Sequence, residues 1–259
     1  MKSTTTAAPV ALVTGSGRDR VGSVIAQGLA DDGYRIALHY HSSRKDAEET
    51  RDELRKQGID CHAFQANVSE EADVQKLTSE VFDTFGRVDA LVTTSSTWLS
   101  KPLEETTAQD CRSSFDVNTL GTFLVAKEVG LRMVQQDSGG TIVTVGDSAI
   151  SRPYIDHSAY FIAKGSLPTL TRMLAVELGH RNPKVRVNCL DPGPIMFPPD
   201  TGDEEKERLK NSTLVKDANC PSMMTNAVRF LISNTFITGA CLPIDGGQHC
   251  YTPERVRRK

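Results

Sequence analysis

The sequence predicts an α/β fold in which helices cover both faces of a doubly wound, parallel, seven-stranded sheet. Short runs rich in β-branched residues alternate along almost the whole chain with longer segments at helical spacing. That alternation is typical of parallel βαβ units. No repeat or low-complexity linker divides the 259 residues, and a chain of this length can close one core without disulfides or metal. We therefore expect one domain over residues 1–259.

Each strand candidate is a short apolar run bounded by turn residues, and most are followed by a helix candidate. Strands are expected over 10–14, 35–40, 59–65, 90–94, 141–145, 185–190 and 240–244. Helices are expected over 22–32, 45–57, 70–85, 107–136, 159–179, 203–212 and 222–233. Pro168 lies inside the expected helix 159–179, so a kink is expected just after residue 164. In such a sheet, ligands bind at the carboxyl ends of the strands, where the strand order reverses.

Composition narrows the class of partner. The net charge of −3 gives no basic footprint for nucleic acid, and the apolar content is ordinary, so a small-molecule substrate is expected. The only apolar run near the start, residues 10–13, is too short for a signal peptide core or a membrane span, which favours a cytoplasmic protein with no membrane partner. Residues 1–8 are expected to be a flexible N-terminus, and residues 252–259 a solvated basic tail.

Cysteine and histidine spacing gives no sign of a metal. The six cysteines are scattered, with no close pair of the kind that binds zinc or runs a redox cycle, and are expected to be free thiols in a reducing compartment. The six histidines lack a zinc-type i, i+4 pair. No Gly-x-Ser-x-Gly elbow of a serine hydrolase is present either. We therefore expect no metal site.

A glycine-rich turn follows the first strand. Gly15, Gly17 and Gly22 allow the backbone to turn tightly and approach a pyrophosphate at the N-terminus of the next helix, although an ordinary strand-to-helix turn is the alternative. Arg20 occupies the place of the third glycine of G-x-G-x-x-G, so that fingerprint is incomplete. Val21 is included in the expected cofactor site.

The end of the second strand predicts the choice of cofactor. An acidic residue there would bind the ribose of NAD and repel a 2′-phosphate, but none is present. The strand ends instead in hydroxyl, imidazole and guanidinium groups, with Arg18 or Arg20 across the crevice, and a guanidinium suits a phosphate. A solvated basic turn is the alternative. The residues that we expect to hold the phosphate end of NADP(H) on this strand are Tyr40, His41, Ser42, Ser43 and Arg44.

Tyr160 and Lys164 are candidate catalytic residues. They lie four positions apart, on the same face of a helix. A phenol with a pKa of about 10 is a poor acid–base catalyst at neutral pH, but a nearby ammonium lowers that pKa. The pair can then pass a proton to a carbonyl or imine while hydride arrives from nicotinamide. Such a spacing is common by chance, so its value depends on accompanying motifs.

The accompanying motifs form an ordered set that resembles the short-chain dehydrogenase/reductase family over nearly the whole chain. The set comprises Thr14-Gly15, Asn118, Tyr160 with Lys164, Pro192-Gly193 and Asp245-Gly246-Gly247. The resemblance implies a Rossmann-like fold, with Tyr160 as proton donor and Lys164 lowering its pKa and binding the nicotinamide ribose. It also implies that Asn118 holds a proton-relay water and that Pro192-Gly193 packs by the nicotinamide. A homotetramer or homodimer is implied as well, with the helices around Asn118 and Tyr160 at one interface.

Asp147 departs from the family pattern in an informative way. The family normally has a serine thirteen positions before the tyrosine, and here that position holds Asp147. The substitution resembles the pteridine reductase branch, in which an aspartate helps to protonate a ring nitrogen through the tyrosine. Trp98 falls where that branch has an aromatic residue that stacks on the pterin, although a tryptophan that only packs is the alternative. The alternative is that Asp147 has only a structural role and caps the turn after the fifth strand.

The remaining expected site residues border the same crevice. The family's Asn-Asn-Ala-Gly after the fourth strand is replaced by Thr93-Thr94-Ser95-Ser96, which puts the cofactor geometry there in doubt. Further cofactor contacts are expected from Asn67, Val68, Thr94, Ser95 and Ile195. Substrate contacts are expected from Arg20, Ser96, Trp98, Asp147 and Tyr160, under a lid formed by residues 194–218. His157 either lines the pocket or lies in a surface loop, with the surface loop favoured.

Together these features predict an NADPH-dependent reductase that acts on a pterin-like ring or on a small carbonyl or imine. A 3-oxoacyl or ketone reductase of the same family is the alternative enzyme. A non-catalytic sensor that uses NADP(H) to regulate a partner is the alternative from another class. Loss of the Asn-Asn motif favours the sensor, and retention of Tyr160, Lys164 and Asn118 together favours the enzyme.

Overall fold

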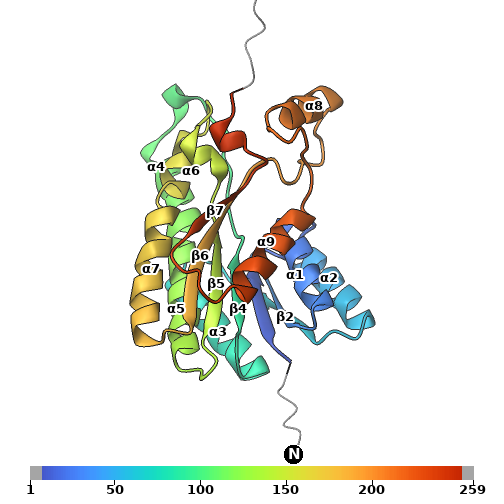
Figure 1. Cartoon of the computed structure of the whole chain (residues 1–259), viewed down its shortest axis with the longest axis vertical. Helices are drawn as coiled ribbons and strands as arrows, with labels where there is room; N and C mark the ends of the chain where they lie inside the picture. The colour runs from blue at the N-terminus through green and yellow to red at the C-terminus, as the bar shows by residue number, and fades with distance from the viewer. Residues whose placement is uncertain (1–7, 253–259) are drawn as a thin grey trace, which may run out of the picture.

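A seven-stranded parallel sheet forms the centre of the molecule, in the computed structural model that describes residues 8–252 (Figure 1). Its strand order is β3-β2-β1-β4-β5-β6-β7. The predicted single-domain, Rossmann-like doubly wound fold is confirmed. The order reverses between β1 and β4, whose paired residues run from Ala11 with Ala90 to Thr14 with Thr93.

The strands and helices begin and end close to the predicted residues. The strands are β1 (Val10–Thr14), β2 (Arg35–Tyr40), β3 (Cys61–Gln65), β4 (Ala90–Thr93), β5 (Gly140–Val145), β6 (Val185–Pro192) and β7 (Cys241–Ile244). The helices are α1 (Val21–Asp31), α2 (Arg44–Lys56), α3 (Glu71–Phe85), α4 (Ala108–Phe115), α5 (Thr122–Val134), α6 (Ser158–Lys164), α7 (Leu167–Arg181), α8 (Asp203–Asn211) and α9 (Ser222–Ser233). Short 3-10 turns occur at η1 (Leu103–Glu105), η3 (Ser148–Ser151) and η4 (Gln248–Cys250), and η2 (Asp116–Gly121) is π-helical.

Two predicted helices are divided. The expected helix 107–136 contains the π-helical segment η2 between α4 and α5, and this segment carries Asn118. The expected helix 159–179 ends at Lys164 and restarts at Leu167, so the break expected near Pro168 is present. Pro168 has no N–H to donate to the carbonyl of Lys164, and it occupies the first turn of α7, where that donor is not needed.

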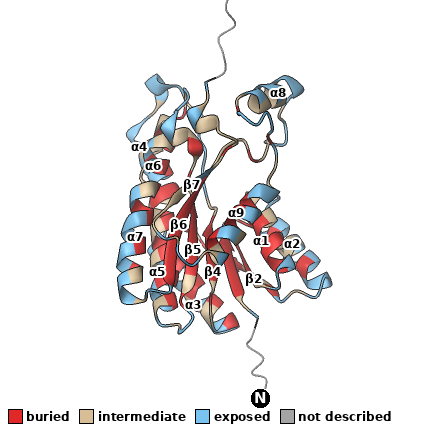
Figure 2. Cartoon of the chain, in the orientation of Figure 1, coloured by how far each residue is buried: buried red, intermediate tan, exposed pale blue. Residues whose placement is uncertain are grey.

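The core lies on both faces of the sheet (Figure 2). One cluster joins the strands to α3, α5 and α7, with Leu77, Met133 and Leu178 among its buried side chains. The other joins the strands to α1 and α9, with Leu29 and Met224 buried. Two packed layers of helices therefore hold the strand ends rigidly, which fixes the side chains that follow them.

The expected lid and termini are partly described. Within residues 194–218, α8 stands away from the body of the sheet (Figure 1). Of the expected flexible start and basic tail, residues 1–7 and 253–259 lie outside the described residues. No described helix combines the length and apolarity needed to cross a bilayer.

The six cysteines are free, as expected, and two that are distant in the sequence lie close together in the structure. Cys189 and Cys241 are far apart in the sequence, yet they are direct partners across the parallel strands β6 and β7. Sequence spacing could not show this proximity, because it arises from the pairing of two strands separated by a long crossover.

Candidate active site

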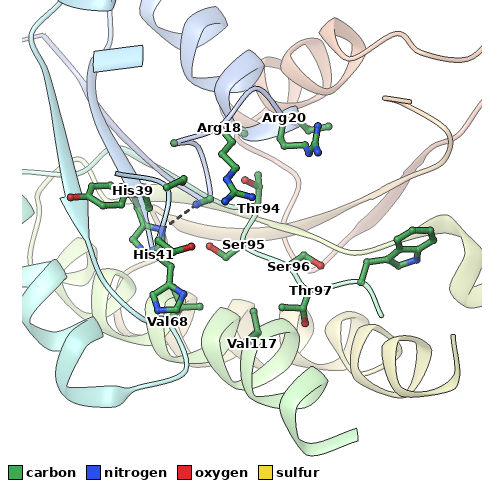
Figure 3. Close-up of a pocket in the computed structure, with 18 of the residues that line it drawn as sticks. Arg18, Arg20, His39, His41, Val68, Thr94, Ser95, Ser96, Thr97 and Val117 are labelled. Atoms are coloured by element: carbon green, nitrogen blue, oxygen red, sulfur yellow. Dashed lines mark hydrogen bonds between the residues drawn. The ribbon is translucent and has the colours of Figure 1, made fainter. Parts of the chain in front are cut away.

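A cleft of about 600 Å³ lies over the carboxyl ends of β1, β2, β3 and β4 (Figure 3). Most of the predicted cofactor residues line it, as the fold requires of residues that follow parallel strands. The predicted residues among its lining are Gly15, Gly17, Arg18, Arg20, Val21, Gly22, Tyr40, His41, Ser42, Ser43, Asn67, Val68, Thr94, Ser95, Ser96 and Trp98. Arg44 is not among them, because its guanidinium turns along α2 to Glu48 at 2.9 Å.

The glycine-rich turn packs closely against its surroundings. Gly15 has a φ of +67°, and a Cβ at Gly17 would lie 2.8 Å from the Cβ atoms of Tyr40 and Ala47. The turn therefore leaves backbone, rather than side chains, facing the N-terminus of α1, where an anion is stabilised. The incomplete fingerprint does not prevent this arrangement, because Arg20 lies outside the helix as the residue before its first turn.

His39 supports the turn, and the sequence reasoning assigned it no individual role. Its Nδ1 accepts a hydrogen bond from the Gly15 N–H at 3.1 Å (Figure 3). Its Nε2 lies 3.1 Å from the Ala66 carbonyl oxygen. Burial lowers the pKa of His39 to about 4, so the ring is neutral and can accept at Nδ1 while it donates from Nε2. The available signal was its position, one residue before the end of the second strand.

The 2′-phosphate end of the cleft offers hydroxyls and one available guanidinium. Ser42, Ser43 and His41 follow β2, and Arg18 faces them from the glycine-rich turn. Arg18 is well exposed and only loosely paired with Asp46, at 3.5 Å. No acidic side chain lines the cleft among the described residues. This donor set fits a phosphate on the adenosine ribose.

The segment that replaces the family's Asn-Asn motif forms its own connections. The Thr94 hydroxyl donates to the Thr14 carbonyl, and the Thr14 hydroxyl accepts from the Thr94 N–H at 3.1 Å. The Ser95 N–H reaches the same hydroxyl at 3.3 Å. These bonds join β1 and β4 at the point where the strand order reverses. The loss of the amides is thus compensated by hydroxyls.

Asn118 is buried and anchors the loop after β4. Its Oδ1 accepts from the Ser96 hydroxyl at 2.7 Å and the Thr97 N–H at 3.0 Å. Its Nδ2 donates to the Thr97 carbonyl at 3.0 Å and the Ser114 hydroxyl at 3.0 Å. Asn118 lies on the π-helical segment η2, and π-helical turns inside helices are frequent at functional sites. The side chain therefore positions the wall of the site, and the relay water remains a prediction.

Asp147 combines the two roles that the sequence left as alternatives. Its Oδ1 accepts from the Ala149 N–H at 2.8 Å and caps η3. Its Oδ2 accepts the hydroxyl of Tyr160 at 2.6 Å. The cap fixes the carboxylate, and the fixed carboxylate then holds the phenol. A short O–H···O⁻ contact of this kind is among the strong hydrogen bonds in proteins.

The pKa of Tyr160 is raised rather than lowered, which contradicts the expectation from Lys164 alone. Burial is the largest cause, followed by the charge of Asp147 and its hydrogen bond. Lys164 lies with its Nζ 6.0 Å from the Tyr160 ring centre and donates to the Val145 carbonyl at 2.8 Å. Burial also lowers the pKa of Lys164. Tyr160 is thus held as a proton-bearing phenol.

An aromatic cluster stands at the other end of the cleft. Trp98, which is 56% exposed, stacks on the ring of His157 with centres 4.5 Å apart and planes 24° apart. The Trp98 Nε1 donates to the Tyr154 hydroxyl at 3.3 Å. His157 is buried, so the favoured surface-loop interpretation is wrong. Tyr154 also packs on Phe161, the neighbour of Tyr160, and so connects this cluster to the helix that carries the phenol.

The start of the expected lid closes one side of the cleft. Met196, Phe197 and Pro198 line it directly. Ile195 is buried in the core beneath them. Gly193 packs tightly against Asp245, since a Cβ added at Gly193 would lie 2.6 Å from the Cβ of Asp245. The cleft lining does not include the predicted residues Pro192, Gly193 and Ile195, nor the predicted catalytic residues Asn118, Asp147, Tyr160 and Lys164.

The fold and the cleft define a dinucleotide-binding oxidoreductase. A family model described as "Enoyl-(Acyl carrier protein) reductase" matches residues 18–249. The "Granaticin polyketide synthase putative ketoacyl reductase 2" of Streptomyces violaceoruber is 32% identical over 93% of this chain and 96% of that protein. The "Hydroxynaphthalene reductase-like protein Arp2" of Metarhizium majus (strain ARSEF 297) is 36% identical over 73% of this chain and 69% of that protein.

A solved structure of a blue fluorescent protein from a metagenomic library, in complex with NADPH, superposes with a TM-score of 0.84. It is 29% identical and covers 93% of this chain and 97% of that one. The chain belongs to the short-chain dehydrogenase/reductase family. It is an oxidoreductase whose cofactor is NADP(H), in agreement with the hydroxyl and guanidinium groups at the end of β2.

Proposed function

We propose that the protein reduces a carbonyl on a planar, aromatic-type small molecule with NADPH. The observation that carries the proposal is that a proton-donating phenol and an exposed aromatic stack are held close together by one helix. The Tyr160 phenol, held by Asp147, lies on the same helix that supports the stack of Trp98 on His157. An exposed indole face favours flat, conjugated rings over aliphatic chains. The two relatives described above carry ketoacyl reductase and hydroxynaphthalene reductase in their names, which is consistent with such a substrate.

The chain's own residues handle the proton. Bound NADPH supplies the hydride. Tyr160 donates its phenol proton to the carbonyl oxygen as negative charge develops there, and the phenolate that remains takes up a proton from solvent. Asp147 is half-buried, and its contact of 2.6 Å with the phenol oxygen holds the phenol in place for this transfer. Lys164 lies beside the phenol and provides the positive charge that limits the cost of a transient phenolate.

A pterin-like ring remains the second candidate, because Asp147 favours it. A carboxyl group behind the phenol supplies a proton to a weakly basic ring nitrogen more readily than a serine hydroxyl does. In that case the proton of Tyr160 goes to an imine nitrogen instead of a carbonyl oxygen.

Purified protein with NADPH tests the proposal against a panel of bicyclic aromatic ketones, dihydropterins, 3-oxoacyl thioesters and aliphatic ketones. We expect NADPH oxidation to be fastest with the bicyclic ketones and to fall by at least about a hundredfold in Tyr160→Phe, because a general acid contributes on the order of 10²–10⁴. Binding of NADPH with no turnover of any compound would instead favour the sensor.

The aromatic cluster has its own control. Trp98→Ala is expected to raise KM for the aromatic substrate by about tenfold, since an aromatic stack contributes about 0.5–1.5 kcal/mol beyond its area. Trp98→Phe should retain most of the affinity. Leu103→Ala removes a similarly exposed apolar side chain outside the cleft lining and should leave KM unchanged. Equal KM values for Trp98→Ala and the native protein would contradict the stacking role.

A further inference from the structure

A pair of thiols lies beneath the catalytic groups and has no part in the proposed reduction. Cys189 and Cys241 are direct partners on β6 and β7. Their sulfur atoms and a carboxylate oxygen of Asp191 all lie within 4.8 Å of one another. The Cys189 Sγ donates to the Asp191 Oδ1 at 3.3 Å. Adjacent strands are about 4.8 Å apart, which falls within the Cα separation of about 4.4–6.8 Å found for disulfides.

The cluster contacts the segment that carries the active site. A Cβ at Gly146 would lie 2.0 Å from the Asp191 Oδ1 and 3.1 Å from the Cys189 Sγ, so both groups pack directly against that glycine. Val145, on one side of Gly146, accepts the hydrogen bond of Lys164, and Asp147, on the other side, holds Tyr160. The thiols therefore contact Gly146, which is adjacent in the chain to both residues that bind the catalytic side chains, Val145 and Asp147.

We propose that Cys189 and Cys241 form a reversible disulfide in response to peroxide, and that this disulfide weakens the binding of NADPH. The two cysteines differ in the way that such a pair requires. Cys241 is half-buried at an edge strand, whereas Cys189 is fully buried. A partly exposed sulfur reacts first, and a neighbouring thiol resolves it.

The pKa shifts of the two thiols also favour Cys241 as the one that reacts first. The pKa of Cys241 is lowered, chiefly by the neighbouring Cys189 thiol, with a smaller contribution from the charge of Arg172. The pKa of Cys189 is raised, chiefly by the neighbouring Cys241 and by burial. Cys241 is thus the first to form a thiolate, and the proton stays on Cys189.

The chemistry balances with hydrogen peroxide as the oxidant. The Cys241 thiolate attacks one peroxide oxygen, the O–O bond breaks, and sulfenic acid and hydroxide form. The Cys189 thiol then attacks the Cys241 sulfur, water leaves, and the S–S bond forms. Two thiols and one peroxide give one disulfide and two waters. A dithiol reductant reverses the reaction by exchange.

The disulfide reaches the cofactor site through Asp191. Oxidation removes the thiol hydrogen that Cys189 donates to the buried Asp191 carboxylate, and Asp191 and Cys189 are two of the groups whose charge acts on Lys164. It also strains the pairing of β6 with β7 just before Pro192-Gly193, because the usual Cα separation across a disulfide, about 5.5–6 Å, exceeds the strand spacing of about 4.8 Å. A structural zinc ion is the less suitable occupant, because the cluster supplies three ligands and faces the Lys164 ammonium.

The test treats the whole protein with hydrogen peroxide and maps its peptides without reduction. We expect one disulfide, between Cys189 and Cys241, and a rise of at least about tenfold in the Kd of NADPH by fluorescence, a loss of about 1.4 kcal/mol. Dithiothreitol should restore both. Cys241→Ser should form no disulfide and keep its NADPH affinity, and Cys189→Ser should stop at a sulfenic acid on Cys241 that dimedone labels.

Cys250→Ser, which removes an exposed thiol from η4, should respond like the native protein. A disulfide that involves other cysteines, or none at peroxide doses that oxidise Cys250, would overturn the proposal. So would an unchanged Kd in protein whose Cys189–Cys241 bond is complete. Stoichiometric zinc in the reduced protein, lost in Cys241→Ser, would assign the cluster to a metal instead.

Discussion

His39 makes the stability of the cofactor turn depend on pH. The ring is fully buried, and its Nδ1 accepts from the Gly15 N–H while its Nε2 contacts the Ala66 carbonyl oxygen. Burial lowers the pKa of this imidazole from 6.5 to about 4. The unfolded chain therefore takes up a proton at a higher pH than the folded chain. The contribution of the neutral His39 ring to the free energy of unfolding is therefore complete above about pH 6.5 and is lost as the pH falls toward 4.

The magnitude follows from the two pKa values. A gap of about 2.5 between them corresponds to at most about 3.4 kcal/mol, at 1.36 kcal/mol for each pKa unit. Between pH 7 and pH 5 the loss amounts to about 2 kcal/mol, which is a large part of the ordinary stability of about 5–15 kcal/mol. A protonated Nδ1 would also face the Gly15 N–H, donor against donor, so the turn itself opens when the ring is charged.

Urea unfolding of His39→Asn at several pH values isolates this contribution. Asparagine keeps an acceptor near Nδ1 but does not titrate, so the variant should be less stable at pH 7 and should lose about 2 kcal/mol less than the native protein between pH 7 and pH 5. His41→Asn, two residues further on at an exposed position, should keep the native pH dependence. Parallel pH profiles for the native protein and His39→Asn would refute the assigned protonation state.

Three further substitutions test the rest of the cleft. Gly17→Ala places a Cβ 2.8 Å from neighbouring side chains, and we expect the free energy of unfolding to fall by about 1–3 kcal/mol and NADPH binding to weaken, by denaturant titration and fluorescence. Arg18→Ala should raise the Kd of NADPH about tenfold or more and leave that of NADH unchanged; an equal effect on both would remove Arg18 from the phosphate. Thr94→Val loses the bond to the Thr14 carbonyl and should cost about 1 kcal/mol of stability.

Most strands were predictable because they are short apolar runs whose two faces are both buried, as in β1, whereas β3 and β7 are partly exposed. Every expected strand is present, with ends displaced by two residues or fewer, as in β3, which begins at Cys61 rather than residue 59. The interruption of the long helix at Asn118 was not predictable. The π-helical turn exists because that amide bonds to Ser96 and Thr97, which come from a distant loop. Tertiary contacts of this kind leave no mark in local helical spacing.

The site was predictable where residues follow strands, and less so where they meet through packing. The residues after the first, second and fourth strands line the cleft as expected, because the fold alone brings those ends together. The burial of His157 under Trp98 depends on the path of the loop before α6, which no periodic pattern specifies. The raised pKa of Tyr160 likewise depends on burial and on the orientation of Asp147, neither of which four-residue spacing reveals.

Asp147 explains why the tyrosine and lysine pair behaves differently here from the simple expectation. With a neutral serine at this position, the ammonium of Lys164 would be the only charge acting on the phenol, and its pKa would fall. The carboxylate 2.6 Å away opposes that effect, so the phenol keeps its proton until a substrate atom takes it. The same carboxylate caps η3, so the group that helps to raise the pKa of Tyr160 is fixed by the turn that follows β5.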